Sequence, residues 1–452
     1  MKYSFALLCL LMTGRLQAED YPPPKTVGGP STLGLGIQRT MTLLAQGETA
    51  RILFYGQSIT EQKWVDKVAA DLRHRFPRAN LVIENRALGG FSSQRLVKPA
   101  EVDLYPFYPD LLIFYVFGSH TDYENIIRRT RERTTAEILI QTDHLSAKAR
   151  LEEEMDPSRL APQGKMWSQF MNYKFLPELA RQYGCGLVDQ RNLWKQYLRD
   201  HNLPPAALLK DGIHLNDHGC YLMAEIVKAY LVRRADPQLD PFNCDTVKTY
   251  VVGKDVHWQN GTLRLPFTGN RVDLLGRPGP AVSVPVRIDG KKPSEFPELY
   301  GFTRAVAPPD EKWPFVLQIG HEQPLILEEW TLQFYDVAPD LKSFRFRVTG
   351  SKTGADGDGS SIERFVSRSG RVVIEPADWD LEYVLKLSKR QMTPDFHLRW
   401  RVVPYFVDEF TGGPVVTVAQ GLANTQHTLE ITGSPATPLT SIRIYRPPQK
   451  GL

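Results

Sequence analysis

Short apolar runs alternate with longer amphipathic stretches over the first half of the chain. The runs are continuous rather than alternating, as in strands of a parallel sheet that is buried on both faces. They lie at residues 52–55, 81–83, 111–117, 138–140 and 187–188. Between them, apolar residues recur at helical spacing, most clearly over 61–76 and 217–233. Strands and helices in this order predict right-handed crossovers and a three-layer α/β sandwich with a parallel sheet over residues 37–234.

The pattern changes after Arg234. Residues 235–249 are rich in Asp and Pro and are interpreted as a linker. Beyond them the apolar runs are short, are separated by turns and alternate with period two, as in 282–288. This alternation predicts a mainly antiparallel β-sandwich region over residues 250–452. Its middle, about 300–412, is longer than one simple sandwich needs and is interpreted as an insertion or a second sandwich.

The N-terminus carries a targeting pattern. Lys2 precedes an apolar run at 5–12, and a small residue, Ala18, follows that run. A positive start, an apolar run too short to span a bilayer and a small residue after it are typical of a secretory signal peptide. A short membrane anchor is less favoured, because the run is brief and ends in polar residues. We therefore expect a signal peptide at 1–18, a secreted or periplasmic chain without a membrane span, and a Pro- and Gly-rich arm at 19–36.

Composition and charge favour a soluble globular protein and narrow the choice of partners. Hydrophobic residues make up 42% and charged residues 23% of the chain, and 55 basic residues nearly balance 51 acidic ones. The net charge of +4 gives only a weak signal for nucleic acid or an anionic membrane, so neither is expected as a partner. The cysteines beyond the signal peptide are too few for a disulfide framework, and none sits in a zinc-binding pattern. No metal or organic cofactor is expected.

Polar residues follow the predicted strands, and the first of them is Ser58. It lies between a strand and a helix, where free backbone N–H groups and the helix dipole stabilise negative charge. A serine at such a turn is more often a helix cap than a nucleophile, so Ser58 alone is weak evidence. Gly89 and Gly90 follow the second strand. A glycine there lets the backbone aim an N–H at a developing oxyanion, although a flexible turn would have the same sequence.

Two further segments carry titratable groups. His120 follows the long third strand and either caps the next helix or faces a site. Asp211 and His214 are three residues apart on a loop before the last predicted helix of the α/β domain. A nucleophilic serine needs a base to accept its proton and an orienter for that base, and this pair can supply both. Taken singly, an Asp-x-x-His match is common by chance.

In their order along the chain, these four segments resemble the SGNH (GDSL-like) hydrolase family over about residues 45–233. The segments are Gly-x-Ser-Ile-Thr after the first strand, Asn-Arg-x-x-Gly-Gly after the second, Gly-x-x-x-Asp after the third and Asp-Gly-Ile-His-Leu before the last helix. The resemblance implies a flavodoxin-like α/β fold and a serine esterase that needs no cofactor. It also implies that Ser58 is the nucleophile, His214 the general base and Asp211 its partner. The backbone N–H groups of Ser58 and Gly90 would form part of the oxyanion hole.

The chain departs from the family pattern at two positions. Gln57 stands where the family usually has Asp, and glutamine keeps the capacity to form hydrogen bonds. His120 stands where the family usually has the Asn that supplies a third oxyanion donor. A neutral or charged imidazole N–H can also donate, so we predict that His120 takes over this role. Gln57 is also a candidate for the substrate cleft, together with Asp143 and His144, which follow the fourth strand and either line the cleft or cap a loop.

The C-terminal region indicates a class of substrate. Its polar turn at 267–276, its strand ending at Asp289-Gly290 and its final strand at 440–445 look like the galactose-binding-like jelly roll often joined to secreted carbohydrate esterases. A plain structural sandwich fits the same residues. Five tryptophans of this region are candidates for sugar stacking, although tryptophan in a sandwich is usually core: Trp258, Trp313, Trp330, Trp379 and Trp400.

The resemblance as a whole implies a secreted serine esterase that removes acyl groups, with acetyl expected, from a polysaccharide. Two alternatives stay open. A lipid or aryl esterase is disfavoured, because no long apolar stretch is typical of a lid or a membrane-docking helix. A carbohydrate-binding protein on a decayed esterase scaffold is suggested by Gln57 and His120, but Ser58 and its partners are all retained.

Overall fold

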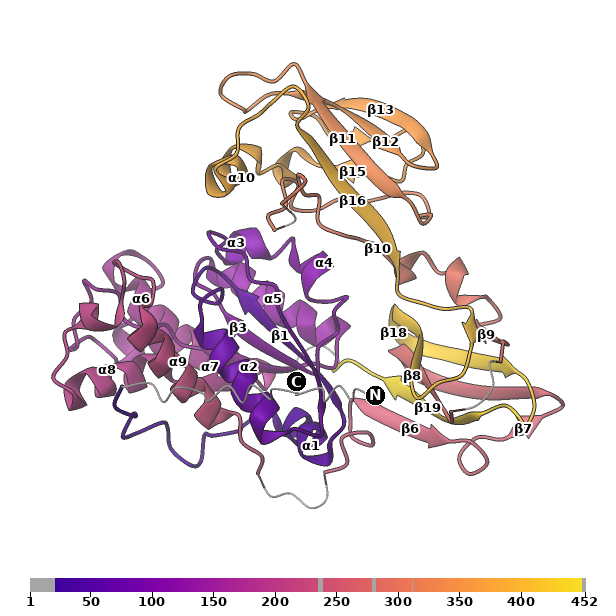
Figure 1. Ribbon diagram of the computed structural model, residues 1–452, viewed down its shortest axis with the longest axis horizontal. Coiled ribbons are helices and arrows are strands. Elements are labelled where there is room, and N and C mark those ends of the chain that lie inside the picture. Colours follow the sequence, from indigo (N-terminus) through magenta and orange to yellow (C-terminus); the bar gives the residue numbers. More distant parts are fainter. Residues whose placement is uncertain (1–20, 235–238, 279–281, 311, 449–452) are drawn as a thin grey trace, which may run out of the picture.

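The computed structural model describes residues 21–234, 239–278, 282–310 and 312–448. The predicted signal peptide at 1–18 and the first residues of the predicted linker lie outside these ranges, so export stays a prediction. Figure 1 shows a sheet flanked by helices, a second sheet beside it and a third sheet beyond one side of the first. Helices, strands and sheets are counted within the described residues.

A parallel sheet of five strands forms the centre of the N-terminal part, in the order β2-β1-β3-β4-β5. Its strands are β1 (Thr49–Gly56), β2 (Asn80–Asn85), β3 (Leu111–Tyr115), β4 (Glu137–Gln141) and β5 (Gly186–Val188). Each predicted apolar run falls on one of these strands, and their order is that of a flavodoxin-like doubly wound sheet. The α/β fold with a parallel sheet that the sequence predicts is confirmed.

Successive side chains of these strands enter two separate cores, one on each face of the sheet. Ile52 and Phe54 belong to one core, whereas Leu53 and Tyr55 belong to the other. The first face is covered by α1 (Gln38–Gln46), α2 (Trp64–Arg75), α8 (Gln190–Asp200) and α9 (Asp217–Tyr230). The opposite face is covered by α3 (Ser93–Leu96), α4 (Ala100–Asp103), α5 (His120–Arg133) and α7 (Leu176–Tyr183).

Beyond the α/β part, the described strands are mainly antiparallel, as the sequence predicts. The first sheet has seven strands in the order β17-β9-β18-β8-β19-β6, with β7 paired to β8. These strands are β6 (Val247–Val251), β7 (Trp258–Gln259), β8 (Thr262–Gly276), β9 (Val284–Ile288), β17 (Glu409–Phe410), β18 (Val416–Thr432) and β19 (Leu439–Tyr445). β6 begins inside the stretch that the sequence predicts as linker. The chain leaves this sheet after β9 and returns to it at β17.

The segment between β9 and β17, called the insertion below, carries a second antiparallel sheet in the order β10-β16-β11-β12-β13. Its strands are β10 (Tyr300–Phe302), β11 (Glu329–Tyr335), β12 (Arg345–Gly350), β13 (Gly354–Ser360) and β16 (His397–Pro404). The pair β14 (Phe365–Val366) and β15 (Val373–Ile374) and the helix α10 (Leu381–Ser388) pack with its buried side chains. Trp330 and Trp400 stack with ring centroids 6.4 Å apart inside this core, so they are packing residues and not exposed platforms.

The insertion packs on the α3–α4 side of the α/β part (Figure 1). One apolar core runs through both, and the rings of Phe91 and Tyr383 lie 6.3 Å apart across the contact. Ion pairs reinforce it, with Arg95 Nε 2.8 Å from the carboxylate of Asp380. The insertion is therefore held where its side chains reach the loop that follows β2.

The described cysteines are packing residues and form no cross-links. Cys185, Cys220 and Cys244 all have free thiols, the first two buried and the third half-buried. Among the helices formed by the described residues, none combines the length and the apolar composition needed to cross a membrane.

We expect Ile113→Ala to lower the free energy of unfolding by about 2–5 kcal/mol, because it opens a cavity in the middle of β3. Ile113 is fully buried, whereas Ile362 is 66% exposed and serves as the matched control. Ile362→Ala should change stability by less than about 0.5 kcal/mol. Chemical denaturation of both variants beside the parent measures the difference, and equal losses would contradict the placement of Ile113 in the core.

Candidate active site

Ser58 lies in the turn after β1, at the carboxyl edge of the parallel sheet. The turn requires a glycine at its start, because a Cβ on Gly56 would lie 2.0 Å from the carbonyl oxygen of Tyr115 in β3. β1 is paired to β2 on one side and to β3 on the other, so the strand order reverses at this point. In doubly wound sheets, ligands bind outside the carboxyl ends of the strands at such a reversal.

The helix after Ser58 begins later than the sequence predicts. α2 starts at Trp64, and the residues before it form tight turns. Side chains compete for the carbonyl groups there, since the indole of Trp64 donates to Ile59 at 2.7 Å and the amide of Asn85 donates to Thr60 at 2.6 Å. Ser58 is therefore outside the first turn of α2. Stabilisation of negative charge at this position depends on N–H groups of the turn, and less on the helix dipole than the sequence predicts.

Ser58, His214 and Asp211 form one series of hydrogen bonds, although the serine and the histidine are 156 residues apart. The Oγ atom of Ser58 lies 2.9 Å from Nε2 of His214. Nδ1 of His214 lies 2.9 Å from Oδ2 of Asp211. A hydroxyl, an imidazole and a carboxylate in this order can pass the hydroxyl proton to the imidazole and stabilise the imidazolium that forms.

Asp211 is oriented by its own loop. Its Oδ1 atom accepts the backbone N–H groups of Ile213 and His214, each at 2.8 Å. These two hydrogen bonds lower the pKa of Asp211 to about 2, although the carboxylate is exposed. The ionised carboxylate accepts the Nδ1–H of His214. The other ring nitrogen, Nε2, faces Ser58 and carries no proton, so it can accept the serine hydroxyl.

Side chains from two other segments hold the loop on either side of His214. Gln62 donates to the carbonyl of Leu215 at 2.8 Å and accepts the N–H of the same residue at 3.0 Å. Nε2 of His144 lies 2.7 Å from the carbonyl oxygen of Ile213. The backbone is thereby fixed immediately before and immediately after the histidine.

His144 is held as a neutral imidazole. The hydroxyl of Tyr115 lies 2.8 Å from Nδ1, so it donates to that nitrogen while the ring donates from Nε2 to Ile213. Burial lowers the pKa of His144 to about 4. The side chain therefore links the end of β3 to the loop that carries His214.

A cavity of about 930 Å³ lies beside Ser58 and His214. The three residues predicted for the substrate cleft, Gln57, Asp143 and His144, are all among its lining. Burial raises the pKa of Asp143, whose carboxylate accepts a hydrogen bond from the side-chain amide of Asn172. The volume is at the upper end of the range for small-molecule sites, about 300–1,000 Å³. Among the residues that the structure describes, no group of three His, Cys, Asp or Glu side chains is placed to hold a metal ion.

The loop with Gly89 and Gly90 is bound from three directions. The Gly89 N–H donates to the carboxylate of Glu61. The Gly89 carbonyl accepts the indole N–H of Trp313 at 3.0 Å, and the Gly90 carbonyl accepts the hydroxyl of Tyr383 at 2.6 Å. Trp313 and Tyr383 belong to the insertion. The insertion thus supplies two of the three groups that orient this loop, Tyr383 from α10 and Trp313 from a segment outside the strands.

Gly90 has no room for a side chain. Its φ is +85°, and an added Cβ would lie 2.7 Å from Leu387 in α10. Within the described part of the chain, nothing accepts a hydrogen bond from the backbone N–H of Ser58 or of Gly90. These N–H groups, which the sequence assigns to the oxyanion hole by resemblance, can therefore bind an acceptor. Gly90 is not among the residues that line the 930 Å³ cavity.

The ring of His120 packs among aromatic side chains at the start of α5. Its centroid lies 5.1 Å from that of Trp167 and 4.7 Å from that of Phe175. The cap of α5 is Ser119, whose hydroxyl accepts the N–H of Asp122, so His120 is not the helix cap. Nε2 of His120 is buried and has no partner among the described residues, and burial lowers the pKa of the ring. Burial thus favours the neutral imidazole, whose N–H can still donate, and the donor role of His120 stays a prediction.

Three contacts of this site could not be inferred from motifs. Glu61 lies close to Ser58 in sequence, but it binds a glycine 28 residues away. Trp313 and Tyr383 bind the same loop from 224 and 293 residues away. The sequence names Trp313 only as one of five candidates for sugar stacking, which is not the hydrogen bond that it forms here.

No family model and no curated protein matches this chain. Solved structures do, among them an α/β hydrolase, LAE5, from the metagenome of Lake Arreo, Spain, at 20% identity over 40% of this chain and 94% of that one, with a TM-score of 0.33. Axe2, an acetylxylan esterase from Geobacillus stearothermophilus, matches at 18% identity over 40% of this chain and 94% of its own, with a TM-score of 0.34. A two-domain esterase active on acetylated mannans, CEX, matches at 14% identity over 92% of this chain and 96% of its own, with a TM-score of 0.36.

We expect His144→Gln to make stability less sensitive to acid. In the parent, the unfolded chain takes up a proton on this imidazole below pH 6.5, while the folded chain does not until about pH 4. Stability is therefore lost as pH falls from 6.5 to 4, and the loss attributable to His144 at pH 4.5 is about 2 kcal/mol. The variant cannot titrate there, so its free energy of unfolding should fall less than that of the parent between pH 7 and pH 4.5.

Chemical denaturation at the two pH values measures this effect. His74→Gln, a change at an exposed imidazole, is the matched control and should keep the acid sensitivity of the parent. An acid sensitivity of His144→Gln equal to that of the parent would rule out a buried, neutral His144.

Proposed function

We propose that this chain is a serine esterase of the SGNH type that removes acyl groups, acetyl foremost, from a polysaccharide. The observation that carries the proposal is the series Ser58–His214–Asp211, with both hydrogen bonds at 2.9 Å. It lies at the sheet edge where doubly wound folds bind ligands, beside a cavity large enough for a small substrate. Secretion, predicted from the N-terminal pattern, is part of the proposal.

In this mechanism Ser58 attacks the ester carbonyl while Nε2 of His214 takes the hydroxyl proton. The bond between Oγ and the carbonyl carbon forms, and the electron pair of the carbonyl moves to its oxygen. When the tetrahedral intermediate collapses, the imidazolium gives the proton to the departing alcohol and an acyl group remains on Ser58. Water, deprotonated by His214, then releases the acid and restores the serine. Asp211 stays ionised throughout and holds the imidazole in one tautomer.

The oxyanion of the intermediate is assigned to the backbone N–H groups of Ser58 and Gly90, with His120 as a third donor. One such donor contributes about 2.7–4 kcal/mol of transition-state stabilisation. The Gly90 N–H belongs to the same planar peptide unit as the Gly89 carbonyl. Trp313 donates to that carbonyl, so its indole orients the N–H on the opposite side of the peptide unit and polarises it.

The insertion holds the loop that is assigned to the oxyanion. Trp313 and Tyr383 bind the carbonyls of Gly89 and Gly90, so the orientation of this loop depends on two parts of the chain. The polysaccharide substrate is proposed from the resemblance of the sequence to secreted carbohydrate esterases with an appended β-region.

Hydrolysis of a chromogenic acetate ester tests the proposed nucleophile. We expect Ser58→Ala to lower kcat/KM by about 10⁴-fold or more, because no other hydroxyl is bonded to His214 among the described residues. Ser343→Ala, at an exposed serine, is the matched control and should match the parent. Acetate release from a panel of acetylated polysaccharides then identifies the substrate. A Ser58→Ala protein as active as the control would instead favour a binding protein on an esterase scaffold.

Trp313→Phe tests the role of the insertion in orienting the loop. The change removes the indole N–H and leaves an aromatic ring, so we expect kcat to fall about fivefold to tenfold, with a smaller change in KM. Trp258→Phe makes the same chemical change in the seven-stranded sheet and should leave kcat unaltered. Thermal melting of both variants separates a loss of orientation from a loss of folding. An unchanged kcat in Trp313→Phe would contradict the orienting role.

A further inference from the structure

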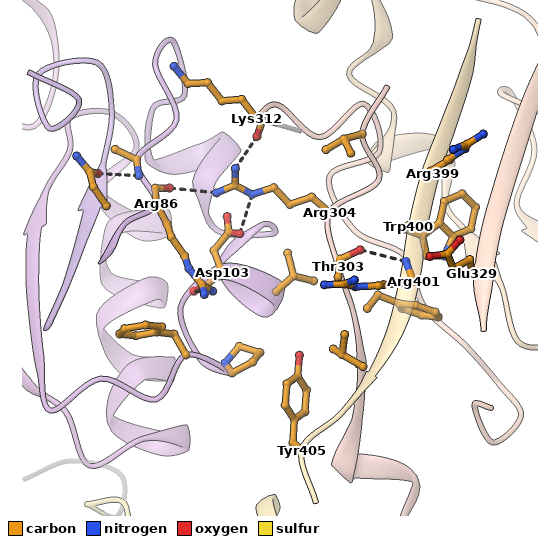
Figure 2. A pocket seen from close by; sticks show the side chains of 18 of the residues that line it. Arg86, Asp103, Thr303, Arg304, Lys312, Glu329, Arg399, Trp400, Arg401 and Tyr405 are labelled. Carbon is orange, nitrogen blue, oxygen red and sulfur yellow. Dashed lines mark hydrogen bonds and ion pairs between the residues drawn. The ribbon is translucent and has the colours of Figure 1, made fainter. Parts of the chain in front are cut away.

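A second cavity, of about 920 Å³, lies between the α/β part and the insertion. Figure 2 shows Arg86 and Asp103 on one wall of it and Thr303, Arg401 and Tyr405 on the other. The first wall comes from β1, β2 and the α4 region, and the second from β10, β16 and the chain beside them. We call this cavity the interdomain cleft.

Cationic side chains outnumber carboxylates around the interdomain cleft. The cations are Arg51, Arg86, Arg304, Lys312, Arg399 and Arg401. The carboxylates are Glu61, Asp103 and Glu329. Two cations are paired to carboxylates of the cleft itself, Arg304 to Asp103 at 2.7 Å and Lys312 to Glu61 at 2.8 Å. Among the described residues, Arg51, Arg399 and Arg401 form no ion pair, so the cleft favours a ligand that carries negative charge.

Cations are crowded on the wall formed by the α/β part. Arg51 and Arg86 both stack on the ring of Phe107, with their guanidinium carbons 4.3 and 4.9 Å from its centroid. Within the described residues, the only acceptor for the guanidinium of Arg51 is the backbone carbonyl of Phe107. Burial lowers the pKa of Arg51, and nearby Arg271 lowers it further. A bound anion would offset the repulsion between these arginines.

The interdomain cleft also presents acceptors that need a hydroxyl donor. Asp103 is buried and its Oδ1 accepts from Arg304, but Oδ2 has no hydrogen-bond partner within the described residues. A buried carboxylate oxygen without a donor is costly, and a ligand hydroxyl removes that cost. Tyr405 adds a hydroxyl that is free of hydrogen bonds to the described residues. Its ring packs against Gly301, where a Cβ would lie 2.7 Å from the ring.

We propose that the interdomain cleft binds a carboxylate-bearing stretch of polysaccharide, a chain that contains uronic acid residues. Guanidinium groups match carboxylates in geometry, so Arg399 and Arg401 bind the acidic groups. Asp103 and Tyr405 bind sugar hydroxyls. A phosphate polymer fits less well, because phosphate oxygens give Asp103 no donor. The volume of about 920 Å³ has room for a short oligosaccharide.

The interdomain cleft adjoins the candidate active site through Glu61. This residue lines the cleft, pairs with Lys312 and accepts the N–H of Gly89. A chain in the cleft therefore lies next to the loop beside Ser58. That the bound chain is the substrate itself rests on the proposed function, whereas the binding of an acidic glycan does not.

Isothermal titration calorimetry on the full chain carrying Ser58→Ala tests the proposal without turnover. The probes are oligogalacturonate, neutral xylo-oligosaccharides of the same length and inorganic polyphosphate. We expect oligogalacturonate to bind at least about tenfold more tightly than either of the others. Arg399→Gln combined with Arg401→Gln should weaken this binding by about 10- to 100-fold. Arg345→Gln combined with Arg347→Gln, on the same face of the same sheet but outside the cleft, is the matched control and should leave it unchanged.

Equal binding of acidic and neutral fragments would overturn the proposal, as would binding of polyphosphate as tight as that of oligogalacturonate. Equal losses in the two double variants would also overturn it, provided that melting shows both to be folded. Oligogalacturonate binding in a chain whose parent hydrolyses no ester would overturn the proposed function alone. Ester hydrolysis by a parent that binds no acidic glycan would overturn this inference alone.

Discussion

Hydrogen bonds to the backbone on either side of His214 are the constraint on which the candidate site depends. Asp211, Gly212 and Ile213 are exposed and His214 is half-buried, whereas Leu215 packs into the core. Gln62 binds Leu215 on one side, and His144 binds Ile213 on the other. His144 can donate to a carbonyl in this way because burial keeps it neutral and Tyr115 fixes which nitrogen carries the proton. The short distance between Ser58 and His214 therefore rests on Gln62 and His144, which play no part in the proposed reaction itself.

The other half of the site is oriented from the insertion. In the loop after β2, Leu88 and Phe91 are buried in the core on either side of the two glycines. The glycines have no side chains of their own, so their peptide units are oriented by the groups that bind their carbonyls. Trp313 and Tyr383 bind those carbonyls from the insertion, more than two hundred residues later in the chain. The insertion is thus a structural part of the site and not only an appended module. A peptide unit held at its carbonyl presents its N–H in a fixed direction, which is what an oxyanion hole requires.

The distribution of charge is more informative than its sum. A net charge of +4 over the whole chain indicates no particular partner. Folding nevertheless gathers arginines from β1, the loop after β2 and β16 around one cleft, where several have no carboxylate partner among the described residues. Local fields of this kind attract ligands because low-dielectric walls screen them less than bulk water does. The composition averages over this arrangement and so conceals it.

The sequence by itself determined the α/β fold and the position of Ser58 at the carboxyl edge of the sheet. Continuous apolar runs indicate strands buried on both faces, and a residue that follows such a strand lies at this edge. That Asp211 and His214 meet Ser58 was predicted from the family resemblance, because these two residues follow a 3-10 helix (Pro205–Leu208) and not a strand. Only the tertiary structure decided where α2 begins, which aromatic rings surround His120, and that Glu61, Trp313 and Tyr383 bind the glycine loop. Those features depend on single contacts between distant segments, in which a side chain replaces a backbone partner or fills a space left by a glycine. Such contacts have no period and no spacing along the chain, and therefore leave no pattern in the sequence.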